Sequence, residues 1–414
     1  MRITLFSWVL CLGILACSPG SRTEVKIPLG EIQEGPWLLT LQLNDSVALP
    51  VNLEMVNDTS VVFINGGERL TATVRFLSQD SLHIIMPYYE TGFQARIGQG
   101  GNRLDGRWYN YAKEDYFIPF SAQSGLTDRF CSDASETEIS HNRYEIHFSP
   151  ESVDHYPALG LFKVEPSGVV LGTFATETGD YRFLQGGVCE GRLQLSCFNG
   201  SHAFLFNANL SGDSLIDGQF YSGNHWNEPW QGRVNPNYEL RDPYTLTEVI
   251  DTSALGLTRF IMENGSNLTL NEVRTPGEVS IIQIMGSWCP NCLDESRFFK
   301  SLYEEYHSMG LSILPLSFES SAEVGPAYAA IHKLERDLDL PFPIYLGGSR
   351  KKSSASEAIP ALNHVMSFPT TIFIDRQGKV RQVHTGFYGP STGAYYDRYM
   401  EMAHALIRTM LSES

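Results

Sequence analysis

VSIIQIMGSWCPNCLDE, at residues 279–295, joins an apolar run to two cysteines that are separated by two residues. Because the run Val279–Met285 is uncharged and bounded by turn residues, we expect a buried strand. Apolar side chains recur at helical spacing from Leu293 to His307, which predicts a helix. A strand that leads into Cys289 and Cys292 at the start of a helix is typical of a dithiol redox site.

The position of the two cysteines at a helix start assigns them different tasks. Unpaired N–H groups and the positive end of the helix dipole stabilise a thiolate on Cys289, which predicts that Cys289 is the attacking nucleophile. Cys292, one turn further, is expected to be shielded and to resolve the mixed disulfide. A Cys-x-x-Cys is also half of a zinc site, but no Cys or His ligands stand nearby at matching spacing. We therefore expect no metal and no cofactor.

Strands and helices alternate on both sides of this stretch, which predicts a central sheet flanked by helices over residues 241–414. The expected elements are a hairpin at Phe260–Leu270, strands at Leu311–Leu316, Thr370–Ile374 and Val380–Val383, and helices at Tyr328–Leu340 and Tyr395–Leu411.

The region before residue 241 reads as short strands with almost no helical periodicity. Alternation or β-branched residues mark strands at Trp37–Leu43, Leu70–Phe76 and Leu82–Met86, and Gly-rich turns separate such runs. This pattern predicts an all-β antiparallel region.

The β-rich region also repeats a motif, because Leu104–Tyr109 (LDGRWY) is echoed by Ile216–Tyr221 (IDGQFY). A spacing of about a hundred residues between the two copies suggests two similar β units, which we place at residues 25–130 and 131–240. The alternative is a common hairpin signal that occurs twice by chance.

The first residues have the composition of a targeting segment. A positive start at Met1-Arg2 precedes the apolar run Ile3–Leu15, which is too short to span a bilayer comfortably. The small and aliphatic residues before Cys17 resemble the lipobox of bacterial lipoproteins, which implies a signal peptide at 1–16, a lipid on Cys17 and an anchor linker at 17–24. A plain secretory peptide is the alternative.

The net charge of the chain excludes some classes of binding partner. The formal net charge is −17, which argues against nucleic acid and anionic lipid surfaces as partners.

Three further cysteines, Cys131, Cys189 and Cys197, are an odd number for an oxidising compartment. The last two could pair with each other, either could pair with Cys131, or they could be buried free thiols.

The Trp-Cys-x-x-Cys motif, together with FPTTIFID at residues 368–375, resembles the TlpA/ResA branch of thioredoxin-fold proteins. The resemblance covers the chain from about Thr258 onward. It implies a thioredoxin-like fold and a thiol-disulfide oxidoreductase anchored in the bacterial cell envelope and facing the periplasm. With its lipobox and its β-rich N-terminal region, this chain looks like the lipoprotein members of that branch from Bacteroidetes-type bacteria.

The resemblance also implies roles for four residues beside the cysteines. Pro369 matches the cis-proline of the family, and the backbone of Phe368 before it pairs with the substrate chain. Trp288 matches the tryptophan that flanks the site. Glu295 matches a glutamate near the disulfide, whereas its ordinary interpretation is a solvated charge in the first helical turn.

A further position differs from thioredoxin itself. Thioredoxin has a buried aspartate six residues before the first cysteine, and Gln283 stands there in this chain. Because Gln283 cannot take a proton, Glu295 becomes the nearest candidate to deprotonate the resolving thiol. Asp294 is a weaker candidate, because we expect it to face solvent.

These features predict a protein-disulfide reductase, and the TlpA/ResA resemblance implies one of the type that serves cytochrome c maturation or thiol repair. The implied partners are client proteins with disulfides or thiols, and a membrane thiol carrier that donates electrons. One alternative is a thioredoxin-fold peroxidase, although that chemistry calls for a Thr-x-x-Cys motif. The other is a binding module in which the β region captures a ligand. His202 stands at a strand entrance. His225 lies among Trp226 and Trp230, where packing is the expected role and a carbohydrate or peptide pocket is the alternative.

Overall fold

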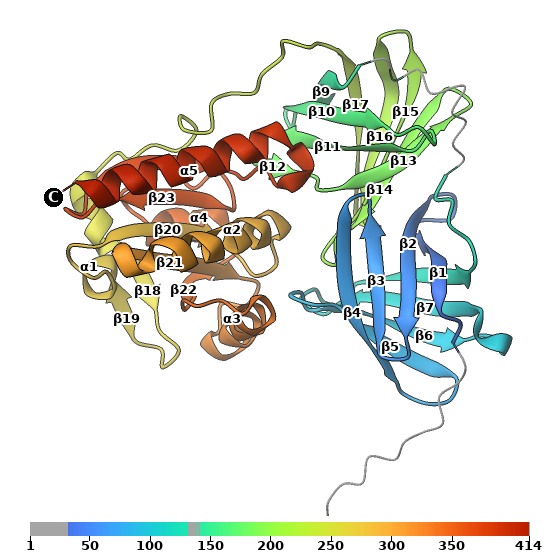
Figure 1. Ribbon diagram of the computed structural model, residues 1–414, viewed down its shortest axis with the longest axis horizontal. Coiled ribbons are helices and arrows are strands. Elements are labelled where there is room, and N and C mark those ends of the chain that lie inside the picture. The colour runs from blue at the N-terminus through green and yellow to red at the C-terminus, as the bar shows by residue number, and fades with distance from the viewer. Residues whose placement is uncertain (1–31, 131–138, 140, 414) are drawn as a thin grey trace, which may run out of the picture.

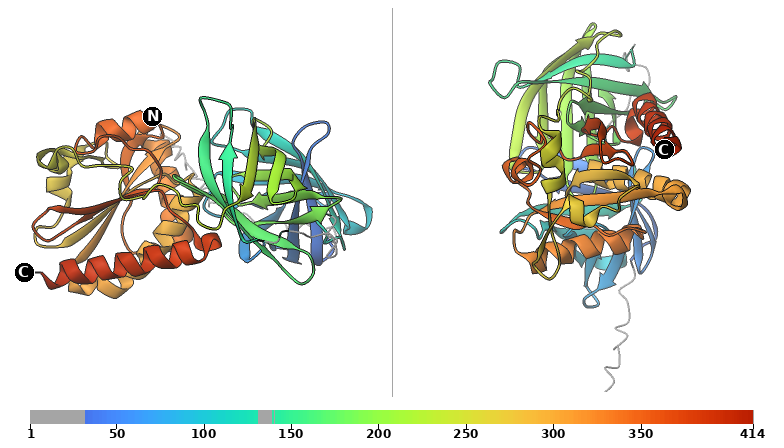
Figure 2. Two further views of the ribbon diagram at one scale, coloured as in Figure 1. Left: turned by 90° about the horizontal axis from the view of Figure 1, so that it is seen from above. Right: turned by 90° about the vertical axis from the view of Figure 1, so that its left-hand side faces the viewer.

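The computed structural model describes residues 32–130, 139 and 141–413. The expected signal peptide at 1–16, the linker at 17–24 with Cys17, and Cys131 lie outside the described residues. Within those ranges, no helix has the length and hydropathy needed to cross a membrane. Two β-rich units lie at one end of the molecule, and a helix-flanked sheet lies at the other (Figure 1; Figure 2, left).

The first β-rich unit is a closed antiparallel barrel. Each strand pairs with the next in the chain, and β1 also pairs with β8, which closes the sheet. Alternate side chains point inward, as in β3, where every second residue is buried. The strands are β1 (Gly35–Gln42), β2 (Ala48–Asn57), β3 (Ser60–Asn65), β4 (Glu68–Phe76), β5 (Ser81–Ile85), β6 (Thr91–Ile97), β7 (Arg103–Asn110) and β8 (Phe117–Ser124).

The second β-rich unit is a nine-stranded antiparallel sheet in which eight strands form a ring and β12 is an extra strand beside β11. Pairing of β9 with β17 and of β10 with β11 completes the ring. The strands are β9 (Arg143–Phe148), β10 (Tyr156–Val164), β11 (Val170–Thr176), β12 (Gly179–Asp180), β13 (Leu184–Cys189), β14 (Arg192–Phe198), β15 (Ala203–Ser211), β16 (Ser214–Ser222) and β17 (Trp226–Val234).

The repeated motif occupies corresponding strands of the two rings. Leu104–Tyr109 lies in β7 and Ile216–Tyr221 lies in β16, and each is the second-last strand of its ring in chain order. In both units the chain runs round the ring strand by strand. The predicted all-β antiparallel region is confirmed, and its two rings agree with the predicted duplication.

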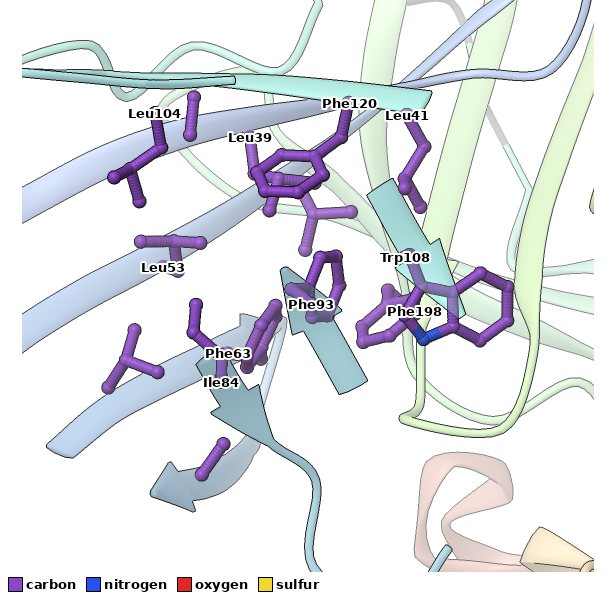
Figure 3. Close-up of a cluster of buried hydrophobic side chains, with 14 of the residues drawn as sticks. Leu39, Leu41, Leu53, Phe63, Ile84, Phe93, Leu104, Trp108, Phe120 and Phe198 are labelled. Atoms are coloured by element: carbon purple, nitrogen blue, oxygen red, sulfur yellow. The ribbon is translucent and has the colours of Figure 1, made fainter. Parts of the chain in front are cut away.

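The second ring inserts an aromatic side chain into the first barrel (Figure 3). Phe198, the last residue of β14, lies 5.2 Å from Phe63, 5.3 Å from Phe93 and 5.3 Å from Trp108, measured between ring centroids. Aromatic contacts of this kind stabilise beyond the area that they bury. They fix the turn that follows Phe198, which faces the C-terminal domain.

The cysteines of the second ring differ from each other. Cys189 is disulfide-bonded, whereas Cys197 is a free thiol with no exposed surface. The possible Cys189–Cys197 pair is therefore wrong. Cys197 lies in the apolar core of the ring, where it packs as a small hydrophobic residue.

The C-terminal domain is a seven-stranded mixed sheet in the order β19-β18-β22-β21-β20-β23-β24. Every residue of β20 is buried; Ile281 packs toward α2 and α5, while Ile282 and Ile284 pack toward α4. The strands are β18 (Arg259–Ile261), β19 (Asn267–Thr269), β20 (Val279–Met285), β21 (Leu311–Glu319), β22 (Tyr345–Ser349), β23 (Thr370–Ile374) and β24 (Val380–Thr385). The helices are α1 (Leu270–Val273), α2 (Pro290–Tyr306), α3 (Val324–Leu338), α4 (Lys352–Ala358) and α5 (Ala394–Ser412). The predicted sheet with flanking helices is confirmed.

Candidate active site

The two cysteines lie where β20 ends and α2 begins. Cys289 is the N-cap residue of α2, and its sulfur accepts a hydrogen bond of 3.3 Å from the backbone N–H of Cys292. Pro290 occupies the first helical position, where its missing N–H costs nothing and its ring fixes a helical backbone angle. Both cysteines are free thiols; Cys289 is 6% exposed and Cys292 is fully buried. Cys289 is therefore the sulfur that an incoming disulfide can reach.

The segment before β23 lies against Cys289. The Phe368–Pro369 peptide bond is cis, and the carbonyl of Phe368 accepts a hydrogen bond of 3.5 Å from the Cys289 thiol. The rings of Trp288 and Phe368 form a T-shaped contact with their centroids 5.6 Å apart, and the indole N–H of Trp288 donates to the carbonyl of Phe318 at 2.8 Å. The structure thus brings together all the residues that the sequence placed around the nucleophile.

Glu295 lies in the second turn of α2 and has no exposed surface, so its interpretation as a solvated first-turn charge is wrong. Three donors hold its carboxylate, and each comes from a different element. Tyr399 of α5 donates to Oε1 at 2.7 Å, Thr371 of β23 donates to Oε1 at 2.8 Å, and Gln283 of β20 donates to Oε2 at 3.0 Å.

Burial controls the proton chemistry of this carboxylate. It raises the pKa of Glu295 to about 7, although the three hydrogen bonds favour the charged form. Burial also raises the pKa of the Cys292 thiol well above its usual value, and the nearby Glu295 charge adds to that rise. A carboxyl group with a pKa near neutrality, one helical turn from a thiol that must lose its proton, has the properties of a general base.

Gln283 links the carboxylate to the resolving cysteine. Its Nε2 donates to Glu295 and, at 3.2 Å, to the backbone carbonyl of Cys292. Its Oε1 accepts from the hydroxyl of Ser296 at 2.9 Å. The residue that replaces the thioredoxin aspartate therefore positions the glutamate.

The prediction that Asp294 faces solvent is wrong. Asp294 is 6% exposed and forms ion pairs with Arg297, at 2.8 Å, and with Arg182 of the second ring. Arg182 also pairs with Glu68 of the first barrel, so one guanidinium joins all three units. Because Arg182 lies 112 positions before Asp294, no local sequence pattern could reveal the pair.

The Cys289 sulfur opens into a cavity of about 300 Å³ between the C-terminal domain and the second ring. The C-terminal domain contributes Trp288, Cys289 and Phe368, and the ring contributes Tyr181, His202 and Phe204. The sequence marks neither Tyr181 nor His202 as a site residue, since His202 stands only at the entrance of an expected strand. No spacing signal pointed to either, because the ring reaches the site only through the tertiary fold.

Other missed residues hold Glu295 rather than the cysteines. Thr371 stands two positions after Pro369, so its closeness to the site was accessible from the motif. Tyr399 is one of 19 tyrosines and lies over a hundred positions from Glu295, with nothing in the sequence to distinguish it. Among the described residues, no group of three or more His, Cys, Asp or Glu side chains is arranged to hold a metal ion.

The family comparison matches the part of the chain that carries the two cysteines. The Redoxin family model matches residues 253–396. Thiol-disulfide oxidoreductase ResA of Bacillus subtilis (strain 168) is 27% identical over 129 residues, which are 31% of this chain and 64% of ResA. ResA of Geobacillus kaustophilus is 28% identical over 110 residues, which are 27% of this chain and 56% of that protein. The chain thus spans less than two thirds of the length of these curated relatives.

Among solved structures, an uncharacterized thioredoxin-like protein from Porphyromonas gingivalis is 19% identical. The match covers 37% of this chain and 92% of that one, with a TM-score of 0.29. The family match and the helix-flanked sheet coincide on the part of the chain that carries Cys289 and Cys292. Residues 253–396 therefore form a Redoxin-family domain with a thioredoxin-like fold, related to the ResA thiol-disulfide oxidoreductases.

Proposed function

We propose that this chain reduces disulfides in the bacterial cell envelope through Cys289 and Cys292. The observation that carries the proposal is the placement of Cys289 at the N-terminus of α2, with a backbone N–H directed at its sulfur and Cys292 buried behind it. A helix N-terminus stabilises a thiolate, and the thiolate is the form that attacks a disulfide.

The reaction follows from this geometry. The Cys289 thiolate attacks one sulfur of the substrate disulfide, and a mixed disulfide forms while the first substrate thiol leaves. Cys292 then gives its proton to Glu295 and attacks Cys289, so that the protein pair becomes a disulfide and the second thiol is released. Trp288 and Phe368 border the reacting sulfurs, and Pro369 shapes the segment against them.

The direction of electron transfer and the cellular location of the protein are part of the same proposal. Reduction fits a compartment that is oxidising and therefore needs a dedicated source of reduced thiols. We propose that a membrane thiol carrier reduces the pair again, and that a lipid on Cys17 holds the protein at a membrane facing the periplasm. Cytochrome c maturation and thiol repair are the processes that the ResA resemblance favours. The division into units at 25–130, 131–240 and 241–414 likewise remains a proposal.

Two single variants test the assignment of the cysteines. Cys289→Ser should abolish disulfide reduction, whereas Cys292→Ser should accumulate mixed disulfides with substrates, because the second step is lost. Non-reducing electrophoresis and mass spectrometry of the captured adducts measure this. Capture by Cys289→Ser in place of Cys292→Ser would reverse the assignment.

A third variant tests the anchor. Cys17→Ala should release the protein from membranes or block its processing, because a lipoprotein's several acyl chains bind firmly. Unchanged membrane fractionation of the variant would remove the lipoprotein proposal.

A further inference from the structure

The cavity at Cys289 has one wall that the thioredoxin-like domain does not provide. Nine of its lining residues belong to the second ring or to its turns, and the others surround the nucleophile. The ring residues include Thr178, Asp180, Tyr181, Asn199, His202 and Phe204.

Hydrogen bonds between the two domains hold this wall in place. The Asp180 carboxylate accepts from the backbone N–H of Gly389 at 2.8 Å and from the hydroxyl of Ser391 at 2.6 Å. Ser367, beside the cis-proline segment, donates to the carbonyl of Thr178 at 2.8 Å. Ser201 donates to the carbonyl of Trp288, the residue before Cys289, at 3.0 Å. The wall is therefore docked on two segments next to Cys289, and a substrate reaches the 6%-exposed cysteine through the cavity.

Two lining residues from one turn of the ring carry polar atoms without a partner. His202 Nδ1 and Asn199 Nδ2 are buried and make no hydrogen bond within the described part of the chain. Asn199 Oδ1 accepts from the backbone N–H groups of Ser201, at 3.0 Å, and of His202, at 2.8 Å, which leaves the amide NH₂ available as a donor. Because buried polar groups are nearly always paired, the Asn199 amide indicates a missing acceptor, and His202 Nδ1 indicates a missing partner that accepts or donates according to the tautomer.

A cation completes the lining. Lys352, the first residue of α4, lines the cavity and forms no ion pair with the residues that the structure describes. Burial lowers the pKa of His202 to about 3, so that its imidazole is neutral and offers a hydrogen bond without a charge. The polar groups of the cavity therefore suit carbonyl and carboxylate oxygens, while the rings of Tyr181, Phe204 and Trp288 suit a carbon–sulfur chain.

We propose that the cavity is a substrate site for low-molecular-weight cysteinyl disulfides that carry carboxylate and amide carbonyl groups. The inference rests on the proposed function and puts small disulfides ahead of the folded protein clients that the sequence resemblance implies. A volume of about 300 Å³ lies at the small end of ligand sites, which leaves room for one half of a small disulfide. The docked wall favours a substrate that can enter the cavity over a folded protein surface.

The reaction at this site balances as a single two-electron exchange. Cys289 and Cys292 lose two electrons and two protons and become a disulfide. The substrate S–S bond is broken, and each half leaves as a thiol. A dithiol donor of lower potential must reduce the pair again before the next cycle.

The test is single-turnover oxidation of the reduced full-length protein by three disulfides. Oxidised glutathione carries the proposed groups, 2-hydroxyethyl disulfide is small but has no carboxylate, and insulin is a folded protein. Free thiols are counted by alkylation and mass spectrometry at set times. We expect oxidised glutathione to react at least about tenfold faster than insulin, which corresponds to about 1.4 kcal/mol of selective binding.

Lys352→Gln isolates the carboxylate contact. It should slow oxidation by glutathione disulfide about two- to fivefold, the range for one exposed ion pair, and leave the rate with 2-hydroxyethyl disulfide unchanged. Lys351→Gln is the matched control, because Lys351 is the adjacent lysine and does not line the cavity; it should alter neither rate.

The outcomes separate this inference from the proposed function. If insulin oxidises the pair as fast as glutathione disulfide does, or if Lys352→Gln leaves both small-disulfide rates unchanged, the small-substrate site is refuted while the reductase stands. If none of the three disulfides oxidises Cys289 and Cys292, the proposed function itself fails.

Discussion

Replacing Glu295 by Gln removes an ionisable group from the interior of the site with almost no change of shape. The variant keeps an oxygen for the hydroxyls of Tyr399 and Thr371, which both donate to Oε1. Its new NH₂ group then faces Nε2 of Gln283, which is also a donor. Two opposed donors cost about 1–3 kcal/mol, so the variant should fold with a modest loss of stability.

The kinetic effect should be larger than the effect on stability. With a pKa of about 7, about half of the Glu295 side chains are carboxylates at pH 7 and can accept the proton of Cys292. Loss of a positioned general base slows a step by about a hundredfold or more. The attack by Cys289, which does not need this base, should keep its rate.

Rapid mixing of the reduced protein with 2-hydroxyethyl disulfide, acid quenching and mass spectrometry follow the mixed disulfide directly. In the wild type, its resolution should accelerate as pH rises through about 7, because Glu295 becomes a base. In Glu295→Gln, the mixed disulfide should accumulate and this pH dependence should disappear.

Glu319→Gln is a matched control for that experiment. Burial raises the pKa of the Glu319 carboxyl as well, but Glu319 accepts from Ser287 and Ser317 and has no hydrogen bond to Glu295 or Gln283. Resolution rates of Glu295→Gln that superimpose on the wild type from about pH 5 to 9 would refute the role of Glu295.

Three further predictions concern stability. Folding raises the pKa of Glu295 from an ordinary value near 4.5 to about 7, so the folded state binds more protons than the unfolded state between these pH values. The free energy of unfolding should therefore fall by about 3 kcal/mol as pH rises from 4.5 to 7. Urea unfolding of Glu295→Gln should show no such dependence on pH. Arg182→Ala leaves Asp294 and Glu68 buried without their shared cation, which should cost about 3–5 kcal/mol; a loss below 1 kcal/mol in urea unfolding would show that solvent replaces the ion pairs. Phe198→Ala empties the aromatic contact between the two rings and should cost about 3–5 kcal/mol, measured by thermal unfolding, whereas a neutral result would mean that the barrel core does not depend on it.

The cysteine pair and its surroundings were predictable because their signals are local. The uncharged run at Val279–Met285 matches β20 residue for residue, and the Cys-x-x-Cys at a helix start fixes both cysteines within one turn. The sequence also marked Glu295 and the Pro369 segment by their match to a family pattern. Burial of Glu295 could not be read from spacing, since it depends on side chains of two distant elements.

Weak local signals explain the elements that the sequence analysis missed. Strand β22 (YLGGS) contains two glycines, which lower strand propensity, and it forms between parallel and antiparallel neighbours. Helix α4 (KSSASEA) is seven residues long and holds three serines, which compete with helix formation. The largest omission, the ring wall over Cys289, arises from ion pairs and hydrogen bonds between residues 87 to 189 positions apart.

The reduction potential of the Cys289/Cys292 pair tests the central proposal most directly. Equilibration of the full-length protein in dithiol redox buffers, with the fraction of free thiols read by alkylation and mass spectrometry, gives its value. A reductase of this type should lie near the potential of thioredoxin, about −270 mV. A value near that of a strong envelope oxidant, about −120 mV, would contradict the proposal that this chain supplies electrons to its substrates.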